Sequence, residues 1–214
     1  IYTAPFLGEP HSLEIYRYFR TTQYQDINEF YDNFFDKCKL ILEPDRLKNE
    51  LKTFSNSNFL KTHKYYSDND RKFRYFRENI LSNNQFDEIM KSLMVDMSFD
   101  EKSIIKNLWM SNEDLVNLSN NGHIIGLHSH SHPTNFSNLS LDNQNDEYKK
   151  NFGHIYDITN NKPEAMSHPC GRYTSDTLSV LKNMGIHLGF RSNIDLTNPS
   201  PLEISRVSHS YLIK

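Results

Sequence analysis

The sequence predicts an α/β protein of 214 residues in which short strands alternate with helices, with a large helical insertion near its start. Short apolar segments recur along the chain, at residues 1–6, 123–128, 163–169, 186–192 and 202–208. Amphipathic helical patterns separate the later segments, and an almost wholly helical pattern runs from Leu13 to Met110. Alternating strands and helices are typical of parallel βα units. We therefore expect one domain over residues 1–214, with the insertion at about residues 13–118.

The first apolar segment, residues 1–6, runs into Pro5 and then Gly8, which suits a short buried strand. The insertion follows it, and its clearest helix covers residues 26–42. One face of that helix carries Ile27, Phe30, Tyr31, Phe34 and Phe35. Pro44 is well placed to open the next helix, and residues 85–94 repeat the amphipathic pattern. Aromatic residues make up 13% of the chain, so we expect them to supply much of the core.

Several capping signals mark helix ends. Ser98 with Glu101, and Ser111 with Asp114, have the spacing of a capping box at a helix start. Gly122 is expected to end the helix that follows Ser111. Residues 140–159 and 175–185 are predicted to be the helices that separate the later strands, and Gly185 ends the second of them.

Composition excludes several classes of function. The net charge is −3, from 24 basic and 27 acidic residues, so no strong field favours nucleic acid or an anionic membrane. No run of about 18 apolar residues occurs, so we expect no membrane span. The first ten residues lack the pattern of a secretory signal peptide. Cys38 and Cys170 are the only cysteines, so no disulfide framework is expected.

The strongest functional signal is a histidine cluster that follows the predicted strand at residues 123–128. Within five residues the chain places His128, His130 and His132, directly before Pro133. Pro133 and the neighbouring serines favour a loop that leaves the strand end. Such loops carry the chemistry in barrel enzymes, and neutral imidazole is a good zinc ligand. The cluster therefore favours metal binding over a polar loop with incidental histidines.

The stretch "IGLHSHSHP" resembles the second motif of the NodB-type polysaccharide deacetylases, carbohydrate esterase family 4. In that family a His at a strand end is followed by Ser or Thr, and a second His follows in the loop. The resemblance implies that His128 and His132 are metal ligands and that the Ser129 hydroxyl orders the loop. It also implies that His130, at a variable position, is not a ligand.

A second resemblance follows in the stretch "MSHPCGRYTSDTLSVLKNMGIHLGFRSN". It is similar to the family's Pro-aromatic-Gly loop, followed by a helix and by the next strand. The resemblance implies that Pro169 and Gly171 shape the loop and that the backbone N–H of Cys170 is an oxyanion donor. It further implies a NodB-like distorted (β/α) barrel.

Other parts of the family pattern are missing. No Asp-Asp pair occurs in the sequence, although the family's first motif supplies a third metal ligand and a catalytic base from such a pair. We expect that motif, with the first strand of the barrel, to lie upstream of Ile1. The arginine of the family's third motif is also absent. For the late catalytic histidine, His209 in "RVSHS" is the one candidate, and an exposed polar His is the simpler interpretation there.

Family members remove the acetyl group from an N-acetylated sugar. The resemblance therefore implies a metal-dependent hydrolase of a carbon–nitrogen amide bond, which uses a divalent ion, in the first place Zn2+, and acts on an acetylated sugar or glycan. Without the aspartates, we expect this chain to bind metal weakly and to catalyse poorly. Two alternatives are an inactive relative that binds carbohydrate, and an interaction module built on the helical insertion. An Asn- and Lys-rich chain without an export signal suits a bacterial cytoplasmic enzyme of surface-glycan assembly.

Overall fold

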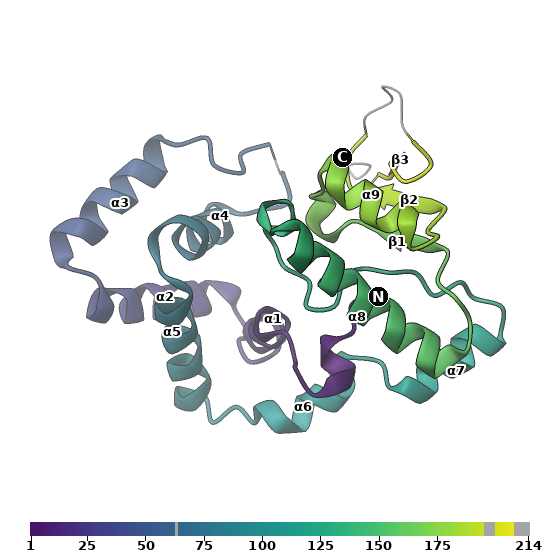
Figure 1. Ribbon diagram of the computed structural model, residues 1–214. Helices are drawn as coiled ribbons and strands as arrows, with labels where there is room; N and C mark the ends of the chain where they lie inside the picture. The colour runs from purple at the N-terminus through teal and green to yellow at the C-terminus, as the bar shows by residue number, and fades with distance from the viewer. Residues whose placement is uncertain (63, 195–199, 208–214) are drawn as a thin grey trace. The chain divides into compact units, whose positions relative to one another are not determined.

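A computed structural model describes residues 1–62, 64–194 and 200–207 (Figure 1). The chain divides into two compact units. We call residues 12–104 the helical unit, and residues 1–11 with 105–214 the strand unit. The expected organisation as one domain with an insertion at about residues 13–118 stays a prediction.

The helical unit confirms the helical pattern predicted after Leu13. Its elements are α1 (Ser12–Thr22), α2 (Ile27–Ile41), α3 (Pro44–Asn56), α4 (Asp68–Tyr75), the π-helical turn η2 (Phe76–Ile80) and α5 (Asn83–Asp96). Helix α6 (Glu101–Leu108) leads from this unit into the strand unit. Pro44 occupies the first turn of α3, as predicted, because its fixed φ suits a helix start.

Aromatic side chains form the core of the helical unit. Phe34 on α2 meets Phe73 on α4 edge to face, with ring centroids 4.8 Å apart, and Phe30 meets the same ring at 5.3 Å. Phe30 and Phe34 are fully buried. Edge-to-face pairs of this kind add about 0.5–1.5 kcal/mol each beyond the burial of their area. The expectation that aromatic residues supply the core is confirmed for this unit.

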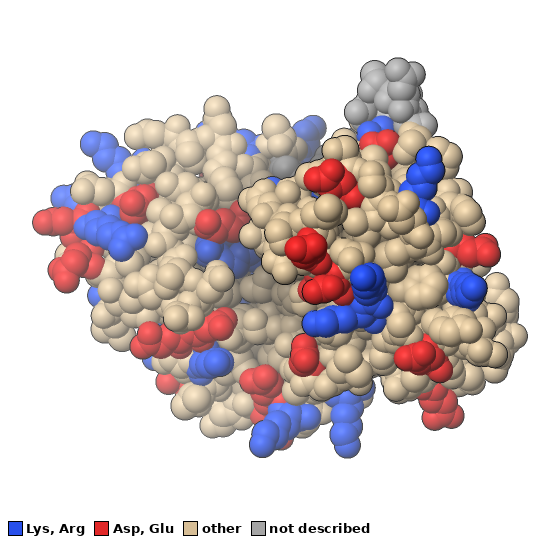
Figure 2. All heavy atoms as spheres, in the orientation of Figure 1, with Lys and Arg blue, Asp and Glu red and all other residues tan. Residues whose placement is uncertain are grey.

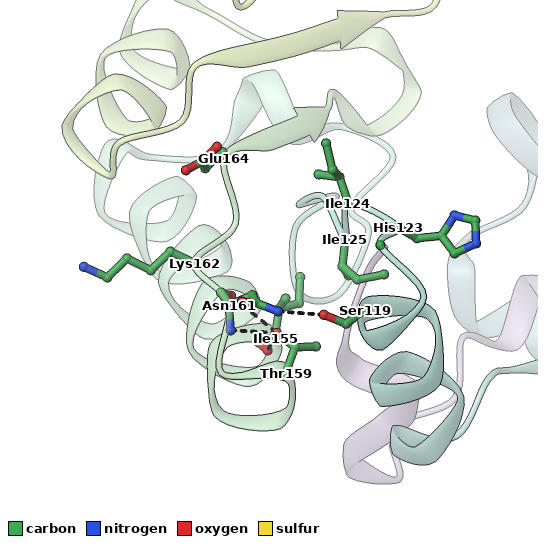
Figure 3. A pocket seen from close by; sticks show the side chains of 10 residues that line it. Ser119, His123, Ile124, Ile125, Ile155, Thr159, Asn161, Lys162 and Glu164 are labelled. Carbon is green, nitrogen blue, oxygen red and sulfur yellow. Dashed lines mark hydrogen bonds between the residues drawn. The ribbon is translucent and has the colours of Figure 1, made fainter.

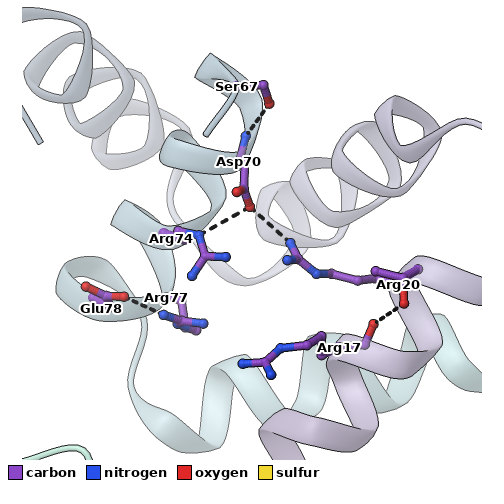
Figure 4. Close-up of polar contacts among 8 residues, drawn as sticks. Arg17, Arg20, Ser67, Asp70, Arg74, Arg77 and Glu78 are labelled. Atoms are coloured by element: carbon purple, nitrogen blue, oxygen red, sulfur yellow. Dashed lines mark hydrogen bonds and ion pairs between the residues drawn. The ribbon is translucent and has the colours of Figure 1, made fainter. Parts of the chain in front are cut away.

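A charge cluster ties α1 to α4 within the helical unit (Figure 4). The Oδ1 atom of Asp70 lies 3.1 Å from Arg20 Nη1 and 3.3 Å from Arg74 Nε. The three side chains are only 13–19% exposed. One carboxylate therefore serves two guanidinium groups in a site that is largely removed from water.

The strand unit contains a small parallel sheet in the order β1 (Ala165–Ser167), β2 (Leu188–Arg191) and β3 (Ile204–Ser205). Met166 pairs with Gly189, and Phe190 pairs with Ile204. Helix α9 (Ser175–Asn183) connects β1 to β2, which is the βα crossover that the sequence predicts. The expected α/β class with parallel strands is confirmed.

Helices α8 (Leu141–Thr159) and α9 cover the core of this unit. Helix α8 packs against α9 and against α7 (Asn112–Asn120), as Figure 1 shows. The apolar faces of α8 and α9 meet the sheet in one cluster, made of Leu127, Phe136, Tyr148, Ile155, Met166, Val180, Leu181, Ile186 and Leu202. This core fixes the strand ends from which the histidine loop departs.

Two of the predicted strands are not strands. Residues 4–7 form a short 3-10 turn, η1 (Ala4–Leu7), because Pro5 fixes φ in its first turn and cannot donate to a ladder. The segment 123–128 contributes only the bridge between Leu127 and Met166.

The expected barrel is therefore corrected for the described part of the chain, where the sheet has three strands and no complete barrel is formed. Further short turns connect its elements, namely η3 (Phe136–Asn138) and η4 (Pro169–Gly171). None of the helices in the described ranges is long and apolar enough to cross a membrane. On the face shown in Figure 2, acidic and basic side chains are interspersed.

The helix ends follow the predicted caps with one exception. Ser111 and Asp114 form the capping box of α7, and Gly122, at φ 83°, follows its end. Gly185, at φ 82°, likewise follows the end of α9. The capping box predicted at Ser98 is wrong, because the Asp100 carboxylate accepts from the N–H groups of the first turn of α6 instead.

Candidate functional site

The loop that carries His128 and His132 leaves the end of the segment paired with β1. Two hydrogen bonds pair Leu127 with β1. Its N–H donates to Ala165 O and its carbonyl accepts from Ser167 N, each at 2.9 Å. The loop then turns sharply, with left-handed φ values of 62° at Ser129 and 57° at His132. The buried Ser129 hydroxyl accepts from His132 N at 3.1 Å. Its role in ordering the loop is the one that the family resemblance implies.

A short contact with the end of β1 orients the His128 ring. Its Nδ1 atom lies 2.6 Å from the carbonyl oxygen of Ser167, at the end of β1. A carbonyl can only accept, so Nδ1 carries the proton and Nε2 carries the lone pair of a neutral ring. Burial lowers the pKa of His128 from 6.5 to about 4, although the Ser167 contact acts in the opposite direction. At neutral pH the ring is therefore in the form that ligates a metal, with the outer hydrogen bond typical of such ligands.

His132 lies beside His128. The ring centroids are 4.8 Å apart and the ring planes are tilted by 47°. Two imidazoles that each place a nitrogen about 2 Å from one tetrahedral zinc have ring centroids about 5 Å apart. The pair therefore fits two positions of a zinc site. Across the part of the chain that the structure describes, no group of three or more His, Cys, Asp or Glu side chains is arranged to complete such a site.

His130 has different partners, although it lies between the other two in sequence. Its Nδ1 is 3.0 Å from the Thr3 hydroxyl, and its Nε2 is 3.9 Å from a Glu9 oxygen. The side chain is buried, with 5% exposed. These contacts use the His130 ring to attach residues 3–9 to the loop, in keeping with the implication that it is not a metal ligand.

Asn151 and Glu147 on α8 form hydrogen bonds to the histidine loop. Neither contact was predicted from the sequence. The fully buried Asn151 amide accepts from His128 N at 2.9 Å and donates to Ile1 O and Thr3 Oγ1, at 3.0 and 3.2 Å. The Glu147 carboxylate accepts from the N–H groups of His130 and Ser131, at 2.9 and 2.8 Å. The sequence does contain one local signal for Asn151, because this residue lies on the apolar face of the helix predicted at residues 140–159.

An aromatic group surrounds His132 on its other side, and it was also missed. The Tyr2 ring lies 5.4 Å from the His132 ring, and the His11 ring meets His132 edge to face at 5.9 Å. Tyr2 and His11 also contact each other, at 6.2 Å. No local sequence pattern links these residues to the loop, because more than a hundred positions separate them.

Cys170, the predicted oxyanion donor, lies in η4, which follows β1 directly. Its backbone is left-handed, with φ 52°, and its side chain is exposed. Gly171 has φ 66°, in the left-handed region that favours glycine. The donor role of the Cys170 N–H stays a prediction. His209, the other predicted catalytic residue, lies outside the described residues.

A cavity of about 190 Å3 lies at the opposite end of the same segment (Figure 3). It is lined by residues at the start of the 122–125 segment and of β1, including Ile125, Lys162 and Glu164. Figure 3 shows the His123 ring directed away from the other labelled side chains. This cavity is therefore separate from the end of the segment at which His128 and His132 meet.

Comparison with known proteins supports the resemblance. The profile of the polysaccharide deacetylase family matches residues 94–189. A solved structure with detectable similarity is the Streptococcus pyogenes deacetylase PplD in complex with acetate, at 16% identity over 78% of this chain and 86% of that chain. Its TM-score of 0.43 is too low to establish a shared fold. No curated protein was found to be a relative. The segment that matches this family contains His128, His132 and the Pro169–Gly171 turn.

Proposed function

We propose that the protein is a metal-dependent deacetylase that hydrolyses the N-acetyl group of a sugar in a polysaccharide or a surface-glycan precursor. The observation that carries the proposal is the adjacent pair His128 and His132, with the His128 tautomer set by the Ser167 carbonyl. The pair lies inside the segment that matches the polysaccharide deacetylase family. A bacterial cytoplasmic location stays a prediction.

Each residue of the site has a chemical task in this proposal. His128 and His132 would hold a divalent ion, with zinc the first candidate for two imidazoles. Such an ion supplies Lewis acidity, which polarises an acetyl carbonyl and activates water. The Cys170 N–H would donate to the oxyanion that develops on the acetyl oxygen, a contribution of about 3 kcal/mol for one such donor. Asn151 and Glu147 keep the loop in place for that geometry.

The reaction also needs a carboxylate as general base and third ligand. The family resemblance places it in an Asp-Asp motif, which this sequence lacks. The expectation that this motif lies upstream of Ile1 stays a prediction. Asp195 is the alternative within the chain, and it lies outside the described residues. Loss of a general base typically costs about two to four orders of magnitude in rate.

Zinc binding tests the ligand assignment directly. We expect calorimetric titration to detect weak zinc binding by the chain, and the double variant His128→Ala/His132→Ala to lose it. His130→Ala should retain binding, because its ring faces Thr3, and the exposed His187→Ala is the matched control. Circular dichroism checks that each variant is folded. Equal loss in all histidine variants, or no zinc binding by the wild-type chain, would contradict the assignment.

Acetate release tests the reaction. N-acetylglucosamine oligomers with added zinc are incubated with this chain and with a longer chain that includes the upstream residues. Activity in the longer chain alone supports the proposal in full. Equal activity in both chains supports the reaction but moves the base to a residue such as Asp195. No activity in either chain, or a longer chain without an Asp-Asp motif, contradicts the proposal.

One observation favours a second candidate, an inactive relative that binds carbohydrate or a partner protein. No three-ligand group is present among residues 1–62, 64–194 and 200–207. This candidate predicts sugar binding, or association with a partner, without acetate release in any form of the protein. The two experiments above therefore separate it from the deacetylase.

A further inference from the structure

A second cavity, of about 530 Å3, lies in the strand unit beside α7. Its size falls within the range of about 300–1,000 Å3 found for small-molecule sites. The end of α6 and the residues that follow it form one wall, and one side of α7 forms the other. Neither the metal histidines nor the Pro169–Gly171 turn lines this cavity, so the proposed chemistry does not use it.

The lining combines one aromatic ring with several amides. Trp109 is half-buried, and it shares the cavity with Asn107, Asn117 and Asn121, all of which are exposed. An indole offers a flat apolar face, which suits the C–H face of a sugar ring. Each Asn amide both donates and accepts hydrogen bonds, as sugar hydroxyls do.

The charge of the lining also selects a class of ligand. Asp114 is the one charged residue among the described residues that line the cavity, and no Lys or Arg is present there. Hydrogen bonds from Ser111 lower the pKa of Asp114, so it is ionised at neutral pH. A phosphate or a carboxylate would be repelled. A neutral sugar would not, because hydroxyl groups can donate to a carboxylate.

The cavity is connected to the histidine pair through Trp109. The indole Nε1 donates to the Tyr2 hydroxyl at 2.5 Å, and the Tyr2 ring lies 5.4 Å from the His132 ring. Trp109 therefore both lines the cavity and contacts Tyr2, which lies beside His132. A chain of linked sugars could occupy both places, with one unit at the histidines and another at Trp109.

We propose that this cavity is a subsite for a neutral sugar unit of the substrate, with Trp109 as its stacking platform and Asn107 and Asn117 as its polar contacts. The identity of the ligand rests on the proposed function. The subsite itself predicts binding in the absence of metal and of catalysis, and this can be measured separately.

Trp109 provides the measurement, because it is the only tryptophan of the chain. Its fluorescence is recorded while the trimer of N-acetylglucosamine is added to the chain in the presence of a chelator. We expect a saturable change in emission. Asn117→Ala should weaken the apparent affinity by roughly two- to tenfold, which corresponds to the loss of one hydrogen bond. Asn183→Ala, an exposed Asn outside the cavity, is the matched control and should have no effect.

His132→Ala separates this inference from the proposed function. A fluorescence change that persists in His132→Ala and weakens in Asn117→Ala supports the subsite, even when no form of the protein releases acetate. A change that is lost in His132→Ala, or that is the same in Asn117→Ala as in the wild type, would overturn it. So would the absence of any change at saturating trimer. Because Asn117 is exposed on α7, its truncation should leave the fold intact, as circular dichroism can check.

Discussion

Replacement of Asn151 by alanine should both destabilise the strand unit and loosen the histidine loop. The Asn151 side chain is fully buried and makes hydrogen bonds to His128 N, Ile1 O and Thr3 Oγ1. Each such bond contributes about 1 kcal/mol net to the free energy of unfolding, and a buried group left without a partner costs more. We therefore expect a loss of about 3 kcal/mol. For a protein of this length, that lowers Tm by roughly 6–12 °C.

The assay is urea unfolding followed by circular dichroism, together with zinc titration of the folded variant. Asn143→Ala is the matched control, because it makes the same substitution at an exposed position of the same helix. Zinc affinity should fall in Asn151→Ala and not in the control, because the His128 backbone loses the acceptor that holds it. A loss below about 1 kcal/mol, or an equal loss in both variants, would refute the idea that this amide anchors the loop.

Two further predictions concern a buried histidine and the charge cluster of the helical unit. Burial lowers the pKa of His168 below its usual 6.5, so the unfolded chain binds more protons than the folded chain just below that pH. The free energy of unfolding should therefore fall as pH drops from about 7.5 to 5.5. Urea unfolding of His168→Gln should show a shallower decline over the same range. An unchanged decline would show that His168 does not cause this pH dependence. Asp70→Asn should lower the free energy of unfolding by about 2–4 kcal/mol, because Arg20 and Arg74 lose their shared carboxylate in a largely buried site. Asp68→Asn, whose carboxylate is 90% exposed, should cost less than about 1 kcal/mol, and equal losses in the two variants would contradict the importance of burial.

Features set by local physics could be predicted from the sequence. The amphipathic helices, the ends of α7 and α9 at Gly122 and Gly185, and the βα crossover through α9 depend on residues close together in the chain. The spacing of His128 and His132 around Ser129 is also local, because one tight turn brings both rings together. The family resemblance then pointed to the metal chemistry that this pair can support.

The tertiary structure alone decided which elements become strands and which side chains support the site. A strand exists only where a partner supplies a ladder, so the apolar pattern at residues 123–128 yields a single bridge to the short strand β1. Asn151 contacts His128 from 23 positions away in the sequence. Tyr2 contacts His132 from 130 positions away. Contacts of that kind arise from the packing of α8 and of the N-terminal segment around the loop. Periodicity along the chain cannot reveal them, because it reports which face of an element is buried and not what lies against that face.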